Sequence, residues 1–92
     1  MISVSTKSGF KAEIDERALK DWRFTQALVK TQKGSDYDKL EGANAIADLL
    51  MGAENVSALC DHIAKANDGF VPTDIFMAEL SEVILSAKQT KN

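Results

Sequence analysis

The sequence has very few of the residues that build catalytic and metal sites. Among its 92 residues there is one Cys, Cys60, and one His, His62. These two fall short of the four ligands of a structural zinc site, and a lone Cys forms no intramolecular disulfide. They also form no nucleophile–base pair, because residues two apart on a helix point in different directions. We therefore expect Cys60 in the core and His62 at the surface or at its boundary with the core. We also expect no enzyme: no catalytic, cofactor-binding or metal-binding residue.

Long apolar runs and an excess of basic charge are also missing. No segment approaches the ~18–20 consecutive apolar residues of a membrane span, and the N-terminal residues alternate, unlike a signal peptide. The net charge is -3, with 11 Lys or Arg against 14 Asp or Glu. This balance does not suit nucleic acid or an anionic membrane as partner. We therefore expect a cytoplasmic protein whose partner is another protein, with no nucleic acid and no membrane as partner.

The N-terminal segment alternates with a period of two, which predicts two strands. Ile2 and Val4 share one face of the first strand, and Ala12 and Ile14 share one face of the second. Between them, Lys7-Ser8-Gly9 has the length of a hairpin loop, and Gly supplies the positive φ that a three-residue loop needs. An isolated two-stranded ribbon is marginal in water. The hairpin must therefore lie on helices or pair with another chain.

After the hairpin, the apolar period becomes 3.6 and predicts four helices. The first begins at Asp15 and ends near Gly34; the second begins at a capping box, Ser35 with Asp38, and ends at Gly52. The third covers about 54–66, and the fourth begins at Val71-Pro72-Thr73. The expected core stripes are Ala18, Leu19, Trp22 and Val29; Leu40, Ala43, Ile46, Ala47, Leu49, Leu50 and Met51; Val56, Leu59, Cys60 and Ile63; and Phe76, Leu80, Val83, Ile84 and Ala87.

These elements predict one compact domain spanning residues 1–92. A chain of this length buries one continuous core and is too short for two domains. The fold class is mainly α: an N-terminal β-hairpin (1–14) followed by four helices in a bundle (15–88) and a polar tail (89–92).

Two binding motifs that helix pairs often carry are excluded by the residues at their key positions. If Gly69 is placed sixth in an EF-hand loop, positions one, three and twelve are Ala64, Ala66 and Ile75, so three oxygen ligands are lost. A DNA-binding helix-turn-helix would need basic residues on the predicted second and third helices. Residues 36–65 contain two Lys and six Asp or Glu. Calcium binding and duplex recognition are therefore not expected.

Charge is distributed unevenly along the chain. Residues 1–33 contain seven basic and four acidic residues, and residues 34–74 contain two basic and eight acidic residues. The basic N-terminal part could pair with the acidic middle within the fold or between subunits. The alternative is a solvated surface of mixed charge, since exposed ion pairs contribute little to stability.

Apolar residues outside the predicted core stripes are the candidates for partner binding. They are Phe24, Leu28, Phe70, Ile75 and Leu85. At ~100° per residue, Phe24 and Leu28 lie well round the first helix from Trp22. Scattered apolar residues are common on protein surfaces, and the second helix could also cover some of these side chains.

Short segments along nearly the whole chain match one protein family at the same spacing. They are Ser8-Gly9-Phe10, Asp15, Asp21-Trp22, Leu49-Leu50-Met51-Gly52, Asp61-His62, Asp68-Gly69, Val71-Pro72, Glu79-Leu80 and Lys91-Asn92. In these segments the chain resembles the small tail assembly chaperones of long-tailed bacteriophages and prophages of Gram-positive bacteria.

The resemblance implies a non-enzymatic role in phage tail assembly. Such proteins bind the tape measure protein, keep it soluble, and help tail-tube subunits assemble around it. They act in the cytoplasm of the bacterial host and are not expected in the mature virion. A homo-oligomer is a further expectation, with grooves around the first and fourth predicted helices as the binding surface. The alternative is a small intracellular regulatory protein that binds another protein, or DNA as a dimer.

Overall fold

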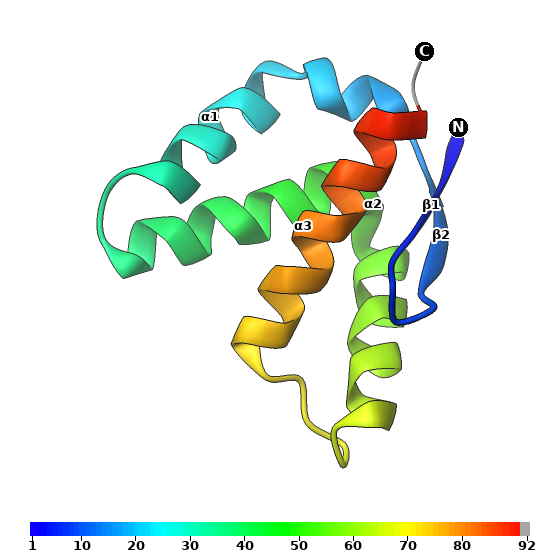
Figure 1. The fold of residues 1–92 in the computed structure, drawn as a ribbon. Coiled ribbons are helices and arrows are strands. Elements are labelled where there is room, and N and C mark those ends of the chain that lie inside the picture. Colours follow the sequence, from blue (N-terminus) through cyan, green and yellow to red (C-terminus); the bar gives the residue numbers. More distant parts are fainter. Residues whose placement is uncertain (91–92) are drawn as a thin grey trace.

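The chain begins with an antiparallel hairpin and continues in helices (Figure 1). The computed structural model describes residues 1–90. Its elements are strands β1 (Ile2–Ser5) and β2 (Lys11–Ile14), a 3-10 helix η1 (Glu16–Lys20), and helices α1 (Trp22–Gln32), α2 (Asp36–Ala66) and α3 (Thr73–Thr90). The predicted mainly α fold with an N-terminal hairpin is confirmed. The predicted helix count is wrong, since residues 1–90 form three α-helices instead of four.

The hairpin has the loop that the sequence predicts, and its strands pair in one register. Ile2 pairs with Ile14. The backbone N–H of Thr6 donates to the carbonyl of Phe10 at 3.0 Å, which closes a three-residue loop. Gly9 in this loop has φ 99°, a conformation that costs glycine no steric energy. The apolar side chains of both strands consequently lie on one face, which packs into the core.

Side chains from α2 and α3 hold both edges of the hairpin. On the β1 side, the N–H of Ser5 donates to Ser86 Oγ at 3.1 Å, and the N–H of Lys7 donates to Glu82 Oε1 at 2.8 Å. On the β2 side, Asn55 Nδ2 donates to the carbonyl of Glu13 at 2.9 Å. Of the two expected alternatives, the hairpin therefore lies on helices of its own chain.

The predicted first helix is divided in two by consecutive N-caps. Asp15 caps η1, and its side chain accepts from the N–H of Arg17 at 3.0 Å. Asp21 has extended backbone angles (φ -74°, ψ 136°), and its side chain accepts from the N–H of Arg23 at 2.8 Å. An Asp that caps in this way begins a new helix. A single continuous helix from Asp15 to Gly34 was therefore a wrong prediction.

Helix α2 combines the predicted second and third helices. It begins at the predicted capping box, where the N–H of Asp38 donates to Ser35 Oγ and the N–H of Ser35 donates to Asp38 Oδ2, both at 3.2 Å. Gly52 has non-helical angles (φ 80°, ψ 163°), and the helix continues after it in a new direction (Figure 1). The expected change at Gly52 is thus a kink without an intervening loop, which accounts for the lower helix count.

Helices α1 and α2 approach each other very closely at Gly42. A Cβ atom at this position would lie 2.6 Å from the carbonyl oxygen of Ala27, closer than any real Cβ contact. Figure 1 shows α1 running beside the first half of α2, with a short turn between them. The absence of a side chain at Gly42 is therefore what permits this close packing.

Helix α3 begins where it was predicted and extends further than expected. The N–H of Phe76 donates to the carbonyl of Pro72 at 3.0 Å, so the first helical hydrogen bond starts at Pro72. Gln89 and Thr90 are helical, whereas a polar tail was predicted from residue 89. The rest of that tail, residues 91–92, lies outside the described residues.

The core is formed by apolar side chains from the hairpin and all three helices. Its buried members are Val4, Phe10, Ile14, Phe24, Ala27, Ala43, Ile46, Ala47, Leu50, Met51, Leu59, Ile63, Leu80, Val83 and Ala87. Most of the stripes predicted for α2 and α3 are present in this set. No helix among residues 1–90 is long and apolar enough to cross a membrane.

Candidate partner-binding surface

A groove with a volume of about 220 Å³ lies where α1, α2 and α3 meet. Its apolar lining consists of Leu28 from α1, Ala43 and Ile46 from α2, and Met77, Leu80 and Ile84 from α3. Thr31, Ser81 and Lys88 also line it. Ala43 and Ser81 have short side chains, which leave space between the helices. We call this the three-helix groove.

A second groove, of about 270 Å³, adjoins the first because both include Ala43 and Met77. We call it the α3-entry groove, since Val71, Thr73 and Phe76 at the start of α3 line it together with Leu40 and Cys60 of α2. Pockets for small molecules usually have volumes of about 300–1,000 Å³. Each groove is smaller than that and suits single apolar side chains of a protein partner better.

The five predicted partner residues lie in different places. Leu28 is half-buried in the three-helix groove. Phe70 is 72% exposed in the turn before α3, and Leu85 is 56% exposed on α3. Ile75 is half-buried and lines a pocket with the hairpin loop. Phe24 is only 4% exposed, so its placement outside the core, and with it a direct role in partner binding, was wrong.

The opposite error concerns three side chains that were predicted to lie in the core and are exposed in the structure. Trp22 is 70% exposed, Val29 53% and Leu40 49%. The stripe of Trp22 and Val29 was projected through Asp21, where the extended backbone interrupts the helix and resets its phase. Recognising Asp21 as a second N-cap would have placed Trp22 at the start of α1 and Phe24 on its buried face.

The single His belongs to a polar cluster that was not foreseen. His62 Nε2 lies 3.0 Å from Ser8 Oγ, and Ser8 Oγ donates to Glu79 Oε1 at 3.0 Å. Glu79 is buried, and the imidazole of His62 lies 5.8 Å from the ring of Phe10. His62 is half-buried, which agrees with the boundary position predicted as one of its two alternatives. Cys60 is also half-buried, so its predicted place in the core was wrong.

The order of groups in this cluster differs from that of a catalytic triad. In a triad the carboxylate holds the His, which then takes the proton of the Ser hydroxyl. Here Glu79 accepts the hydroxyl proton of Ser8 directly, so His62 Nε2 must donate to Ser8 if both hydrogen bonds form together. The arrangement therefore joins the hairpin loop to α2 and α3.

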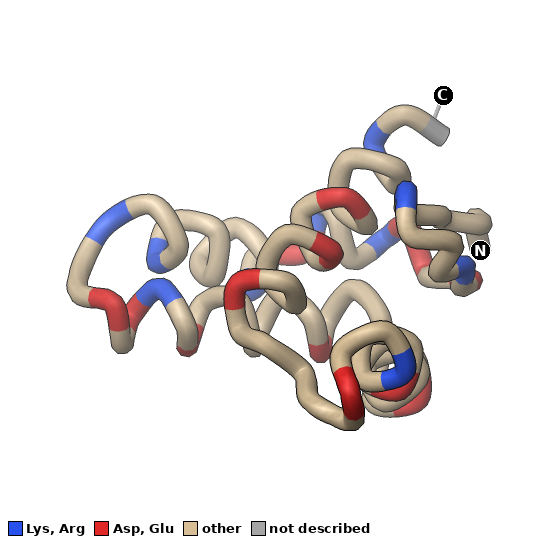
Figure 2. Tube along the Cα trace, turned by 60° about the horizontal axis from the view of Figure 1, so that its bottom comes forward, with Lys and Arg blue, Asp and Glu red and all other residues tan. Residues whose placement is uncertain are grey.

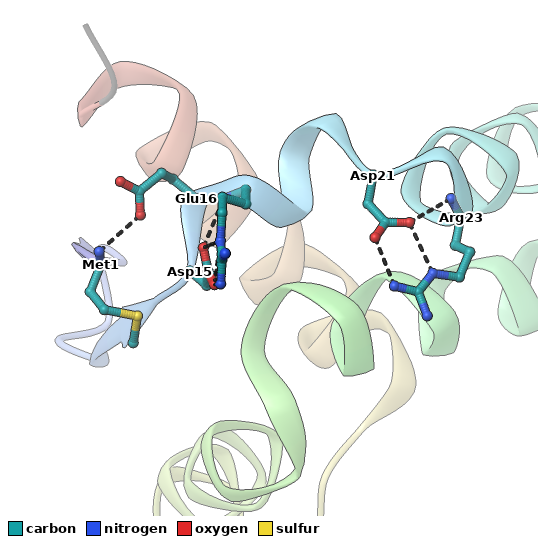
Figure 3. A network of polar contacts seen from close by, with 6 residues as sticks. Met1, Asp15, Glu16, Asp21 and Arg23 are labelled. Atoms are coloured by element: carbon teal, nitrogen blue, oxygen red, sulfur yellow. Dashed lines mark hydrogen bonds and ion pairs between the residues drawn. The ribbon is translucent and has the colours of Figure 1, made fainter.

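The strongest electrostatic effects are local pairs around η1 and the start of α1. Arg17 pairs with Asp15, and Arg23 pairs with Asp21, as Figure 3 shows. Hydrogen bonds from the Arg17 side chain and backbone lower the pKa of Asp15 to about 2, and those from Arg23 lower the pKa of Asp21 to about 2. The terminal ammonium of Met1 lies 3.0 Å from Glu16. These pairs stabilise the two caps.

Few ion pairs join the basic N-terminal part of the described chain to its acidic middle. Among residues 1–90, one ion pair joins them, Lys30 to Glu41 at 2.8 Å. Most of the acidic residues of α2 are exposed. Figure 2 marks the positions of acidic and basic residues along the chain. The same described part of the chain has no group of three or more His, Cys, Asp or Glu side chains placed to hold a metal ion.

Comparison with protein-family models, curated protein sequences and solved structures found no match to this chain. The resemblance to phage tail assembly chaperones therefore stays a prediction from the segments that carry it. The grooves and the exposed apolar side chains are the structural observations on which a function can be argued.

Proposed function

We propose that this protein is a non-enzymatic phage tail assembly chaperone. In the cytoplasm of the bacterial host it binds the tape measure protein, keeps it soluble, and promotes assembly of tail-tube subunits around it, without staying in the mature virion. The observation that supports this proposal best is the pair of adjoining apolar grooves between α1, α2 and α3. Helix α3, the last predicted helix, lines both grooves, whereas α1, from the first predicted helix, lines the three-helix groove alone.

The grooves suit an amphipathic helical segment of the partner. Such a segment presents apolar side chains at positions i, i+3 or i+4, and i+7, which insert into neighbouring hollows. Leu28 and Ile84 would flank one anchor side chain in the three-helix groove, and Leu40 and Phe76 another in the α3-entry groove. Burial of apolar surface in these contacts stabilises the complex by roughly 25 cal/mol per Å². The same contacts cover aggregation-prone parts of the partner.

The exposed aromatic side chain of Phe70 extends this apolar surface. Phe70 precedes α3 and is close in sequence to Val71, which lines the α3-entry groove. Aromatic residues often dominate the energy of protein interfaces because they bury a large area with few rotatable bonds. We assign Phe70 the role of an edge contact beside that groove.

The proposal is tested by co-expression with the tape measure protein encoded by the same phage or prophage. Wild-type protein is expected to raise the soluble fraction of that partner and to co-purify with it. Leu40→Asp places a charge in the α3-entry groove and should abolish both effects. Val29→Asp is the matched control, because Val29 is about as exposed as Leu40 and lines neither groove.

Equal loss of binding in both variants would contradict a groove-specific contact, and a partner that stays insoluble with the wild type would contradict the function. A duplex-binding assay at low salt examines the regulatory alternative. Tight sequence-specific binding there would replace the chaperone by a DNA-binding regulator, whereas we expect no binding from a protein with this acidic middle.

A further inference from the structure

We infer that the outer face of α3 is a contact surface for a second copy of this chain, with the two α3 helices packed antiparallel across a twofold axis near Ser81. This inference does not rest on the proposed function. It rests on the pattern of exposed residues on α3 and on the charges at the two ends of that pattern.

The outer face of α3 is a straight seam. Its members are Asp74, Ala78, Ser81, Leu85 and Lys88, which follow one another at spacings of four, three, four and three residues. At 100° per residue they fall within an arc of about 80°. All five are exposed, and Leu85 is 56% exposed. This spacing is the one by which helices pack against each other in pairs, and the buried residues of α3 lie on the opposite side.

The charges on the seam select the orientation of the second helix. In an antiparallel pair centred on Ser81, residue 74 of each copy lies opposite residue 88 of the other, so Asp74 meets Lys88 at both ends. A parallel pair would place Asp74 against Asp74 and Lys88 against Lys88. Neither residue has an ion pair within residues 1–90, so both charges are available to a neighbouring molecule.

The same register gives the exposed Leu85 an apolar partner. It lies opposite residue 77 of the second copy, which is the half-buried Met77. Ala78 and Ser81 at the centre of the seam are short and allow the helices to approach closely. A single helix pair buries less area than a standard protein interface, so the expected dimer is weak and depends on concentration.

Sedimentation equilibrium of the full chain at ~10 µM to ~1 mM tests this contact through charge reversal. The wild type should dimerise, and more weakly at high salt. Asp74→Lys and Lys88→Asp should each weaken the homodimer at least ~10-fold, because like charges then meet at both ends. The double variant should regain the dimer, and an equimolar mixture of the two single variants should form a heterodimer.

Charge reversal at residues 74 and 88 also removes charges that are favourable at the two ends of α3. A second measurement therefore leaves these charges unchanged. In a Cys60→Ala background, Ser81→Cys should form an interchain disulfide under mild oxidation, since position 81 lies on the twofold axis. Thr25→Cys on the exposed side of α1 is the matched control and should cross-link much more slowly.

Leu85→Ser should weaken the dimer as well, whereas Val29→Ser, a change at a similarly exposed position on α1, should leave it unchanged. A wild type that stays monomeric at ~1 mM would overturn the inference. A dimer that is insensitive to Leu85→Ser, or equal cross-linking at positions 81 and 25, would assign the contact to another surface.

Discussion

The environments of Trp22 and Phe24 depend on where one helix begins. Both are aromatic and lie within the first turn of α1, yet Trp22 is 70% exposed and Phe24 4% exposed. The N-cap at Asp21 sets the phase of the helix, and this phase turns Phe24 toward the core and Trp22 toward solvent. Two neighbouring aromatic residues thus differ in role: one stabilises the core and the other is available for contacts.

This difference predicts unequal effects of truncation. Phe24→Ala should lower the free energy of unfolding by about 3–5 kcal/mol, because it removes a buried ring and leaves a cavity. Trp22→Ala should change it by less than about 0.5 kcal/mol, as expected of an exposed position. Urea denaturation followed by far-UV circular dichroism measures both, and similar losses in the two variants would contradict the phase described for α1.

The capping carboxylates predict a dependence of stability on pH. Asp15 and Asp21 have folded-state pKa values lowered to about 2 from 3.8. A lowered pKa contributes stability that is fully present above the unfolded pKa and is lost as the pH falls through the folded pKa. The Asp15→Asn/Asp21→Asn variant should therefore melt below the wild type at pH 5–7.

The difference in melting temperature between the wild type and the double Asn variant should decrease between about pH 4 and pH 2. In this range the wild-type carboxylates become protonated. The Arg17→Gln/Arg23→Gln variant removes the arginine of each ion pair and keeps the aspartates. Its own stability should still fall between about pH 4 and pH 2, but by less than that of the wild type, because it removes the side-chain hydrogen bonds and keeps the backbone N–H bonds of residues 17 and 23 to the carboxylates. A gap that stays constant down to pH 2 would mean that these carboxylates do not stabilise the folded state.

The bend in α2 determines how the elements are placed. The first half of α2 packs on α1, and the second half packs near the hairpin (Figure 1). The backbone at Gly52, with φ 80° and ψ 163°, lies in a region that is essentially restricted to glycine. One residue thus lets a single helical element contact both α1 and the hairpin.

Gly52→Ala is therefore expected to destabilise the fold by about 1–3 kcal/mol, because alanine is strained at this backbone conformation. Steric contact is not the cause, since a Cβ atom at Gly52 would meet nothing within 4 Å. Ser57→Ala, at an exposed position of the same helix, should be neutral or slightly stabilising. Thermal unfolding compares the two, and a Gly52→Ala variant as stable as the wild type would contradict the kink.

The arrangement of the three helices creates the surface on which both proposals depend. Helix α3 crosses the α1–α2 pair and leaves the two grooves beside it, while its outer face stays open. The seam shares Ser81 and Lys88 with the three-helix groove, and Met77, opposite Leu85 in the proposed dimer, lines both grooves. By contrast, Leu40 lines only the α3-entry groove, and Leu85 lines neither groove. Variants at Leu40 and at Leu85 can therefore separate the two functions in one preparation.

Several features made by residues close together in the sequence were predicted correctly. The three-residue loop with Gly9, the capping box of Ser35 and Asp38, and the start of α3 after Pro72 are all present. Each depends on backbone preferences and hydrogen bonds within a few residues, and such signals survive in any tertiary context. The failed prediction at Trp22 and Phe24 was also local, since it followed from overlooking the cap at Asp21.

Features made by distant residues needed the folded chain. The Ser8–His62–Glu79 cluster joins residues 54 and 71 positions apart, and no spacing in the sequence indicates it. The grooves likewise depend on how α3 crosses Ala43 and Leu28, because helix packing decides which apolar side chains are covered and which line a hollow. Local chemistry thus defined the hairpin, the caps and most helix ends, and the packing of those elements defined the surface that a partner can reach.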